Sequence, residues 1–394
     1  MDTPALEQYL KTYKDGLLED ILPFWEKYAL DREDGGFTFC LDRDGSILDT
    51  DKGVWQTARY TWMILTLYNE VERREAWLQT GKHGIDFLEK HCYDETGKLF
   101  FLVDKQGRPL RMRRYVYSEA FAAIAYAAYY KATGLEQYRE KAVETFERFR
   151  DYNYTPGLIP PKFSDHRRMR SMGVPMIGIV TAQELRQNLN DESYTDHISA
   201  WIWEIEQYFL NHQYRAVMET VGPEGEFLDH FDGRTLNPGH ALEGAWFILR
   251  EALYRQRDPE LVRLGCTMTD WMWEIGWDKT YGGIYYFRDV NGLPVQEYWH
   301  DMNFWWPQTE AVIATLMAYQ LSGDLKYAGW HGEIHQWAFQ HFPDPEHGDW
   351  FGYLHRDGRL SVPLKGNNWK GPFHVPRMHY MAWKICEDLL TTKV

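Results

Sequence analysis

The segment Gly282-Gly283-Ile284-Tyr285-Tyr286-Phe287, followed by Asn291-Gly292, predicts the fold because related segments recur along the chain. An aromatic run that enters an Asn-Gly or Asp-Gly turn is a strong local signal of a β-hairpin. Similar segments lie at residues 34–45, 97–107, 225–233 and 348–358, and a degenerate copy begins at Pro156. Internal repeats of this kind set the architecture of a chain.

Paired helices are predicted between these hairpins, because apolar residues recur there at three- and four-residue spacing. The run Ala120–Ala128 is apolar on every side, as expected of a buried helix, whereas 135–152 is charged on one side. This alternation predicts an inner ring of six helices wrapped by an outer ring of six, with the hairpins at one end. The expected spans are 3–28, 53–73, 75–92, 114–132, 135–152, 171–190, 193–212, 237–256, 258–276, 302–321, 325–341 and 371–390.

The composition narrows the class of protein. The 394 residues are 44% hydrophobic and 16% aromatic, with 18 Trp and 26 Tyr. These rings fill a wide helical core, and some of them can line a pocket for a sugar, which offers C–H faces and hydroxyl edges. The net charge is −15 and no long Lys/Arg run occurs, so neither nucleic acid nor an anionic membrane is an expected partner.

The remaining bulk features predict one soluble, cytoplasmic domain over residues 1–394. The four cysteines lie far apart without a CxxC pair, which suits reduced thiols in a cytosol. No segment holds 18 consecutive apolar residues, and the N-terminus lacks a basic and then apolar signal. No Pro/Gly/Ser-rich linker divides the chain.

Two short motifs, Asn237–Glu243 and Lys370–Arg377, carry the candidate chemistry. Each places a histidine, His240 or His374, two residues after a proline at the predicted first turn of a helix. A helix N-terminus disfavours imidazolium, and a neutral imidazole is a competent general base. The pair therefore suggests one base for each face of a substrate carbon. The alternative is that each is a satisfied core or capping histidine.

A third dense segment, Asp301–Glu310, combines Trp305 and Trp306 with amide and carboxylate groups, among them Asn303. Such a combination is typical of a site that stacks on a ring and hydrogen-bonds its edges.

Arg59 lies within an otherwise apolar helix, so it needs a carboxylate or a ligand oxygen as partner. An internal salt bridge to Glu310 or Glu243 is one interpretation, and a ligand contact is the other; both can hold at once. His240 and Glu243 are three residues apart on one helix face and could orient an imidazole or bind a metal. We favour orientation and expect no metal, because no matching carboxylate cluster accompanies them.

Several cofactor motifs are absent from the sequence. It contains no HExxH, no GxxxxGK[ST], no GxGxxG after a strand and no GxSxG. We therefore expect chemistry that needs no built-in cofactor.

With these motifs the chain resembles the N-acylglucosamine 2-epimerase family, also known as renin-binding protein. The resemblance is most specific at residues 237–243, 305–311 and 369–377, with a further match at Met172–Met176. It implies an all-α (α/α)6 barrel and interconversion of N-acetylglucosamine and N-acetylmannosamine. The segment 369–377 is closer to the acylglucosamine branch than to the related cellobiose 2-epimerases.

The resemblance also implies roles for individual residues. It makes His240 and His374 the acid/base pair and gives Arg59 and Glu310 catalytic roles, with Arg59 beside the oxygen of an enediolate. Glu243 would support His240. The expected substrate contacts are Arg377, Glu243, Trp305, Trp306, Asn303 and Tyr117. ATP as an effector is a family trait for which no nucleotide motif is matched here, and a homodimer is a further expectation.

Three other functions compete with this interpretation. A mannose-type aldose–ketose isomerase, or a mannose or cellobiose 2-epimerase, would use the same scaffold. A glycoside hydrolase would need two carboxylates, such as Glu310 and Asp301, about 6.5–9.5 Å apart if it inverts configuration. A non-catalytic binding protein would leave the histidines without a chemical task.

Overall fold

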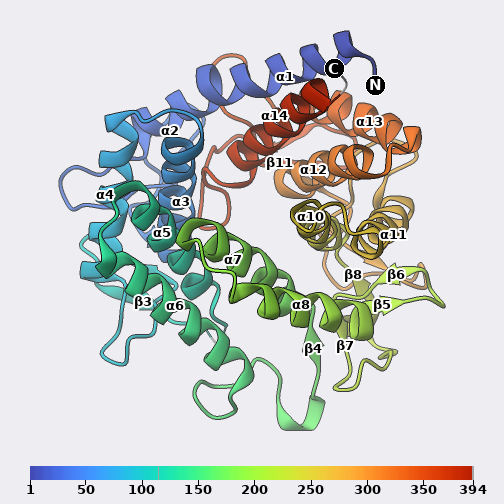
Figure 1. Cartoon of the computed structure of the whole chain (residues 1–394), viewed down its shortest axis with the longest axis horizontal. Coiled ribbons are helices and arrows are strands. Elements are labelled where there is room, and N and C mark those ends of the chain that lie inside the picture. The colour runs from blue at the N-terminus through green and yellow to red at the C-terminus, as the bar shows by residue number, and fades with distance from the viewer. Residues whose placement is uncertain (114, 393–394) are drawn as a thin grey trace.

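A ring of six helices surrounds the axis along which the molecule is seen in Figure 1. The computed structural model describes residues 1–113 and 115–392. The inner helices are α3 (Val54–Glu70), α5 (Tyr117–Thr133), α7 (Gly173–Leu189), α10 (Pro238–Tyr254), α12 (Trp305–Ser322) and α14 (His374–Thr392). Each contacts the next along the chain, and Phe373, just before α14, lies 5.6 Å from Trp62 of α3 between ring centroids. The side chains of these two residues close the ring.

A second layer of helices covers the first. It comprises α4 (Glu75–His91), α6 (Glu136–Tyr154), α8 (Tyr194–Glu204), α11 (Pro259–Gly276), α13 (Leu325–His341) and α1 (Thr3–Asp15), and α1 packs against α14. Nearly all of α5 from Ser118 to Tyr129 is buried, whereas α6 buries only one stripe, as their sequence patterns predict. The predicted (α/α)6 barrel is therefore confirmed. Its assignment as one domain over 1–394 stays a prediction, and residues 393–394 lie outside the described part.

Several helix boundaries differ from the predicted ones. The span 3–28 is α1, a π-helical turn (Gly16–Ile21) and α2 (Leu22–Tyr28), and the span 193–212 ends in a π-helical turn (Ile205–Phe209). At Gly16 the chain passes so close to α14 that a Cβ would lie 2.7 Å from the His379 ring.

The helices α12 and α14 each begin three residues later than predicted, at Trp305 and His374. The residues before α12 are held in a strand instead. Pro372 precedes α14 rather than opening it. The predicted start of α5 at residue 114 lies outside the described residues.

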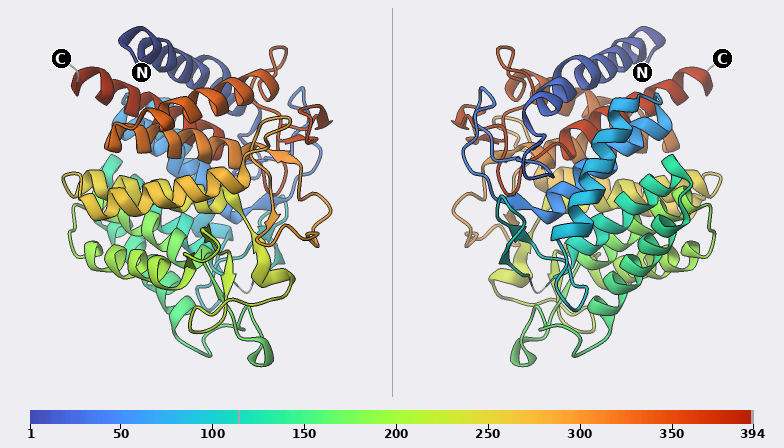
Figure 2. Two further views of the ribbon diagram at one scale, coloured as in Figure 1. Left: turned by 90° about the vertical axis from the view of Figure 1, so that its right-hand side faces the viewer. Right: turned by 90° about the vertical axis from the view of Figure 1, so that its left-hand side faces the viewer.

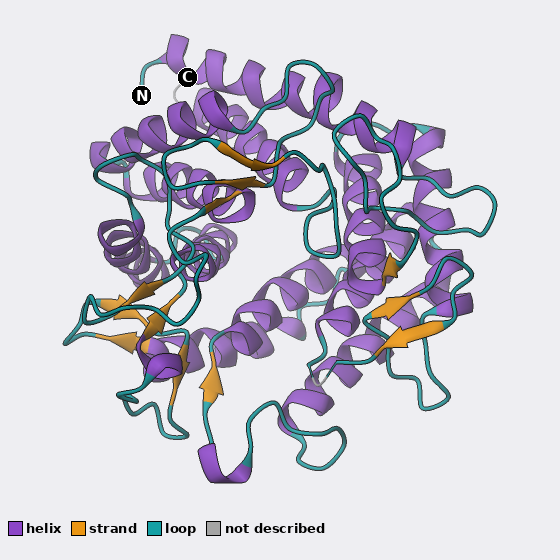
Figure 3. Cartoon of the chain, turned by 180° about the vertical axis from the view of Figure 1, so that it is seen from behind, coloured by secondary structure: helices purple, strands orange, loops and turns teal. Residues whose placement is uncertain are grey.

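Short antiparallel strands and long loops gather at one end of the ring, as the side views in Figure 2 and the view from that end in Figure 3 show. Two sheets have three strands: β1 (Lys52–Gly53), β2 (Leu102–Val103) and β3 (Pro109–Arg111), and β10 (Asn303–Phe304), β11 (Tyr353–Leu354) and β12 (Leu360–Val362). Three pairs complete the set: β4 (Arg170–Ser171) with β7 (Thr220–Val221), β5 (Leu210–Asn211) with β6 (Ala216–Val217), and β8 (Thr235–Leu236) with β9 (Arg288–Asp289). The inner helices thus begin at this end.

The predicted hairpins are present in reduced form. Within residues 282–287, Ile284 forms an isolated antiparallel bridge with Trp277 in place of a regular strand pair. Gly283 has φ 84°, and a Cβ there would meet Oδ1 of Asn303 at 2.4 Å, so only glycine fits this turn. The turn expected at Asp232-Gly233 is instead part of the short helix α9 (Phe231–Arg234).

None of the helices in the described part of the chain combines the length and the apolar character needed to cross a bilayer.

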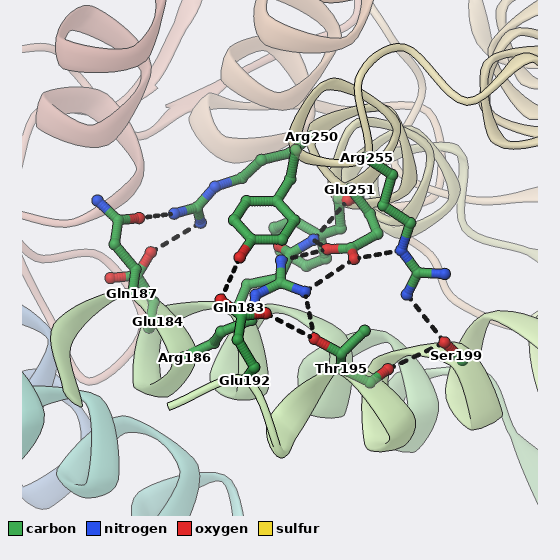
Figure 4. Close-up of polar contacts among 12 residues, drawn as sticks. Gln183, Glu184, Arg186, Gln187, Glu192, Thr195, Ser199, Arg250, Glu251 and Arg255 are labelled. Atoms are coloured by element: carbon green, nitrogen blue, oxygen red, sulfur yellow. Dashed lines mark hydrogen bonds and ion pairs between the residues drawn. The ribbon is translucent and has the colours of Figure 1, made fainter. Parts of the chain in front are cut away.

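A buried ion cluster ties α7 to α10 at the end of the ring opposite the strands (Figure 4). Glu251 of α10 is fully buried and accepts hydrogen bonds from Arg186 of α7 at 3.0 and 2.7 Å. It also accepts from Arg255 at 2.7 Å and from Gln183 at 3.1 Å. Both carboxylate oxygens are therefore fully used.

We predict that Glu251→Ala lowers the free energy of unfolding by about 3–5 kcal/mol, because it removes the carboxylate that pairs with the buried guanidinium of Arg186. Urea denaturation followed by circular dichroism measures the change. The matched control is Glu192→Ala. This change removes an exposed carboxylate of the same cluster, which accepts a hydrogen bond from the Tyr254 hydroxyl, and should lower the free energy of unfolding by less than about 1 kcal/mol. Equal losses in both variants would contradict the prediction.

Candidate active site

A cavity of about 650 Å³ opens at the strand end of the ring, among the N-termini of the inner helices. Its walls are mainly aromatic, with two histidines, an arginine and a carboxylate among them. The lining residues are Trp55, Arg59, Tyr117, Met176, Ile177, His240, Glu243, Tyr286, Trp299, Phe304, Trp305, Trp306, Tyr353, Val362, Asn367, Trp369 and His374. Aromatic faces with a few polar groups suit a ring-shaped polar ligand.

His374 is the first residue of α14 and is oriented by a buried carboxylate. Its Nδ1 lies 2.8 Å from Oε1 of Glu310, whose Oε2 accepts a hydrogen bond from the Trp246 indole at 2.8 Å. Burial, followed by the charges of Arg377 and Arg59, holds the pKa of His374 well below its ordinary value. His374 is therefore a neutral imidazole, as predicted, although burial and neighbouring cations are the main causes.

Arg377, one turn further along α14, joins three inner helices. Its Nη2 lies 2.5 Å from Oε1 of Glu243 on α10 and 2.8 Å from Oε1 of Glu310 on α12. Burial disfavours the charged guanidinium, but the two carboxylates outweigh burial and raise the pKa of Arg377. Glu243 was expected to support His240; its carboxylate contacts Arg377 instead, although its charge still helps to raise the pKa of His240 after the larger effect of Glu219.

Arg59 has no carboxylate partner. The internal salt bridge considered for it is made by Arg377 instead, and within residues 1–113 and 115–392 no acidic group lies within ion-pair distance of Arg59. Its guanidinium carbon lies 4.1 Å from the Phe121 ring centroid and 4.6 Å from that of Phe373. Its Nε is buried without a hydrogen-bond partner, and burial lowers the pKa of Arg59 to about 9. A cation left unpaired at a cavity wall is suited to a ligand oxygen.

His240 lies in the first turn of α10, where the Asn237 side chain caps the helix by accepting from its backbone N–H at 3.2 Å. Its Nδ1 lies 3.1 Å from each carboxylate oxygen of Glu219. Burial opposes the charged imidazole, but Glu219 outweighs it and raises the pKa of His240 above the ordinary value. The carboxylate of Glu219 therefore has a larger effect on this imidazole than the helix N-terminus that the sequence analysis considered.

Trp306 spans the two histidines. Its ring centroid lies 4.9 Å from that of His240 and 5.9 Å from that of His374. The neighbouring Trp305 is buried, and its Nε1 has no hydrogen-bond partner although the residue lines the cavity. Both tryptophans are thus brought to the cavity together with both histidines.

Two further predicted contacts have different positions. Tyr117, the first residue of α5, lines the cavity and stacks on Trp55 with 6.3 Å between ring centroids. Asn303 does not line the cavity: its Nδ2 donates to the Arg356 carbonyl at 3.1 Å, and its Oδ1 accepts from Gln308 at 3.4 Å. It therefore holds β10 in place at the edge of the cavity.

Sequence reasoning missed Glu219 and Asn367. Asn367 lines the cavity and donates from Nδ2 to the Tyr353 hydroxyl at 2.8 Å. No spacing pattern links either residue to the motifs, because both lie in loops that reach the site through tertiary contacts.

One group of potential metal ligands occurs in the described part of the chain. Ligand atoms of Glu243, Glu310 and His374 lie within 4.8 Å of one another. Arg377 already pairs with both carboxylates and so engages one oxygen of each that a metal ion would need. This arrangement favours an acid/base role for His374 over metal binding.

The comparisons with known proteins agree with this geometry. The family model for N-acylglucosamine 2-epimerase (GlcNAc 2-epimerase) matches residues 35–375. The chain is 35% identical to N-acylglucosamine 2-epimerase from Bos taurus over 399 residues, which cover 98% of this chain and 94% of that protein. It is also 35% identical to the protein of that name from Homo sapiens over 384 residues (95% and 88% covered), and 25% identical to cellobiose 2-epimerase from Eubacterium cellulosolvens over 391 residues (92% and 95%).

Solved structures share the fold at lower identity. Cellobiose 2-epimerase from Spirochaeta thermophila superposes with a TM-score of 0.84 at 20% identity, covering 98% of each chain. A D-mannose isomerase superposes with a TM-score of 0.81 at 18% identity, covering 97% of this chain and 98% of that one. From the family match and the identity to its relatives over nearly the whole length, the chain belongs to the N-acylglucosamine 2-epimerase family.

Proposed function

We propose that this protein is a 2-epimerase that interconverts N-acetylglucosamine and N-acetylmannosamine. The observation that carries the proposal is the placement of His240 and His374 on one cavity, each imidazole oriented by a carboxylate, beside Arg59, whose buried Nε has no hydrogen-bond partner. The printed names of the 35% identical relatives support the N-acyl substrate. The match of residues 369–377 to the acylglucosamine branch supports it as well.

The chemical barrier is removal of the proton at C2 of the open-chain sugar, a weak carbon acid. The pyranose ring opens first, with a proton passing from the O1 hydroxyl and one passing to the ring oxygen. One imidazole then takes the C2 proton, and the electron pair moves to O1 to form an enediolate-type intermediate. Arg59 stabilises this oxyanion, and the second imidazole returns a proton to the opposite face of C2.

An isomerase would share the first step and deliver the proton to C1. With an N-acetyl group at C2 that product would require an imine, so return to C2 is favoured. A hydrolase is disfavoured by geometry: Glu310 is fully buried in contact with Trp246, Thr309, His374 and Arg377, and neither it nor Asp301 lines the cavity. A non-catalytic binding protein would have no use for two imidazoles on one cavity that are each oriented by a carboxylate.

We propose that the chemistry needs no cofactor, because His240, His374 and Arg59 supply the proton transfers and the charge. ATP as an effector, a homodimer and a cytoplasmic location are further predictions of the family resemblance.

The reaction outcome is the first test. N-Acetylmannosamine incubated with the protein in D₂O to equilibrium should give N-acetylglucosamine with deuterium at C2 and no ketose, as followed by proton NMR. Mannose and cellobiose run in parallel identify the alternatives. A ketose formed from mannose, with N-acetylmannosamine inert, would instead indicate a mannose isomerase.

The two histidines are the second test. His240→Asn and His374→Asn should each lower kcat by about 10²–10⁴-fold, because each removes one proton-transfer group. His355→Asn, at an exposed loop position, is the matched control and should leave kcat unchanged. The two-base assignment fails if either cavity variant stays within tenfold of the parent while its circular dichroism is native.

The third test concerns Arg59, because its replacement should lower the activity without lowering the stability of the fold. Arg59→Met should lower kcat by about 10²–10³-fold, the usual cost of losing one oxyanion donor. It should not lower the free energy of unfolding, because it removes a buried charge that has no partner. A large loss of stability with retained kcat would assign Arg59 to the core instead.

A further inference from the structure

The carboxylate of Glu219 lies beside the cavity but takes no direct part in the proposed proton transfers. It precedes β7, and its backbone carbonyl accepts from the N–H of Met172 at 3.0 Å, so the β4–β7 ladder holds it in position. Both of its oxygens lie 3.1 Å from Nδ1 of His240. This contact turns Nδ1 away from the cavity and leaves Nε2, on the opposite edge of the ring, for a ligand.

The two histidines each face a carboxylate, but the surrounding charges differ. Beside His374, Arg377 pairs with the carboxylates Glu243 and Glu310, and the charge of Arg59 acts on the same cluster without forming an ion pair. Nη2 of Arg377 lies 3.3 Å from Nδ1 of His374. That cluster is neutral without a proton on the imidazole.

Glu219 has no such counter-ion. Within the described residues its only ion pair is with His240, whose side chain is 32% exposed. A carboxylate that no arginine neutralises favours the charged form of the imidazole that it contacts. The pKa of the histidine in the same residue pair, histidine with glutamate, is therefore shifted in opposite directions at the two positions.

We propose that Glu219 is a positioning residue that keeps His240 protonated and its Nε2–H directed into the cavity, so that the free site holds one transferable proton, on His240. This inference rests on the proposed function. In the free site, His240 is then the proton donor and His374 the proton acceptor, and this protonation state suits one of the two epimers. The other epimer requires the proton on His374, so the site must exchange its proton with solvent between successive turnovers in one direction.

The charges that face this pair set the sign of its pH dependence. His240 faces Glu219, Glu243, Lys162 and His374. Burial, with a smaller contribution from the charge of Glu219, raises the pKa of Tyr286 to about 12. Glu219 contributes in the same direction to the raised pKa of Tyr117.

Because the pKa of His240 is raised, its proton is kept at pH values above the ordinary histidine range and is lost as the pH rises through the raised value. Removing the Glu219 charge should move this loss to lower pH. Removing the Lys162 charge, which opposes protonation, should move it to higher pH.

The experiment is a histidine NMR titration of the full-length protein without substrate. The His240 signal is assigned from the spectrum of His240→Asn. Glu219→Gln should lower its midpoint by about 1–3 pH units, the usual effect of an adjacent opposite charge. Lys162→Gln should raise it, and Glu219→Asp should keep it nearer the parent value.

The matched control is Glu226→Gln, which removes a carboxylate from the loop on the other side of β7. Among the described residues, its side chain accepts a hydrogen bond from the backbone N–H of Glu224 alone. Its His240 midpoint should equal that of the parent. An equal midpoint in Glu219→Gln and Glu226→Gln would overturn the inference.

The second readout is the pH profile of kcat/KM with N-acetylmannosamine. Its alkaline limb should move to lower pH in Glu219→Gln and return in Glu219→Asp, since the limb reports loss of the donor proton. A uniform loss of rate without movement of the limb would make Glu219 merely structural. If the substrate is inert, the titration still decides the role of Glu219, and only the proposed function fails.

Discussion

The ion pairs of Arg377 are the interaction on which the rest of the site depends. One guanidinium on α14 contacts Glu243 on α10 and Glu310 on α12, so side chains from three inner helices meet at a single buried ion cluster. Buried carboxylates without such a partner would be costly to keep charged. Because Arg377 satisfies both of them, Glu310 can orient His374 without making it a cation.

The same arrangement leaves Arg59 available to a ligand. Two arginines project from inner helices toward one cluster, but the carboxylates are already engaged by Arg377, and aromatic rings surround Arg59 instead. Aromatic faces stabilise a guanidinium without occupying its N–H donors. The cavity therefore keeps an unsatisfied positive charge beside a neutral base, which is the combination that removal of a proton next to a carbonyl requires.

Local patterns in the sequence predicted the ring and part of the cavity wall, because the periodicity of α5 and the motifs around His240 and His374 lie in contiguous residues. Helix boundaries at Trp305 and His374 were less predictable: strand pairing such as that of Asn303 with Leu354 decides where α12 begins, and the partner strand is far away in sequence. The partners of the charged groups could not be predicted. Whether Arg59 or Arg377 pairs with Glu243 depends on how α14 closes the ring, and Glu219 reaches His240 only because β4 pairs with β7.

The packing of α1 against α14 has a consequence for the newly made chain. Leu6 and Tyr13 of α1 are fully buried in the finished protein, with Tyr13 hydrogen-bonded to His331 and against the ring of His379. During synthesis this first helix emerges long before the residues that cover it, so its apolar face stays exposed while almost the whole ring is translated. Such exposed surface invites association with other chains, and a nascent chain of this kind depends on chaperones until its last helix docks.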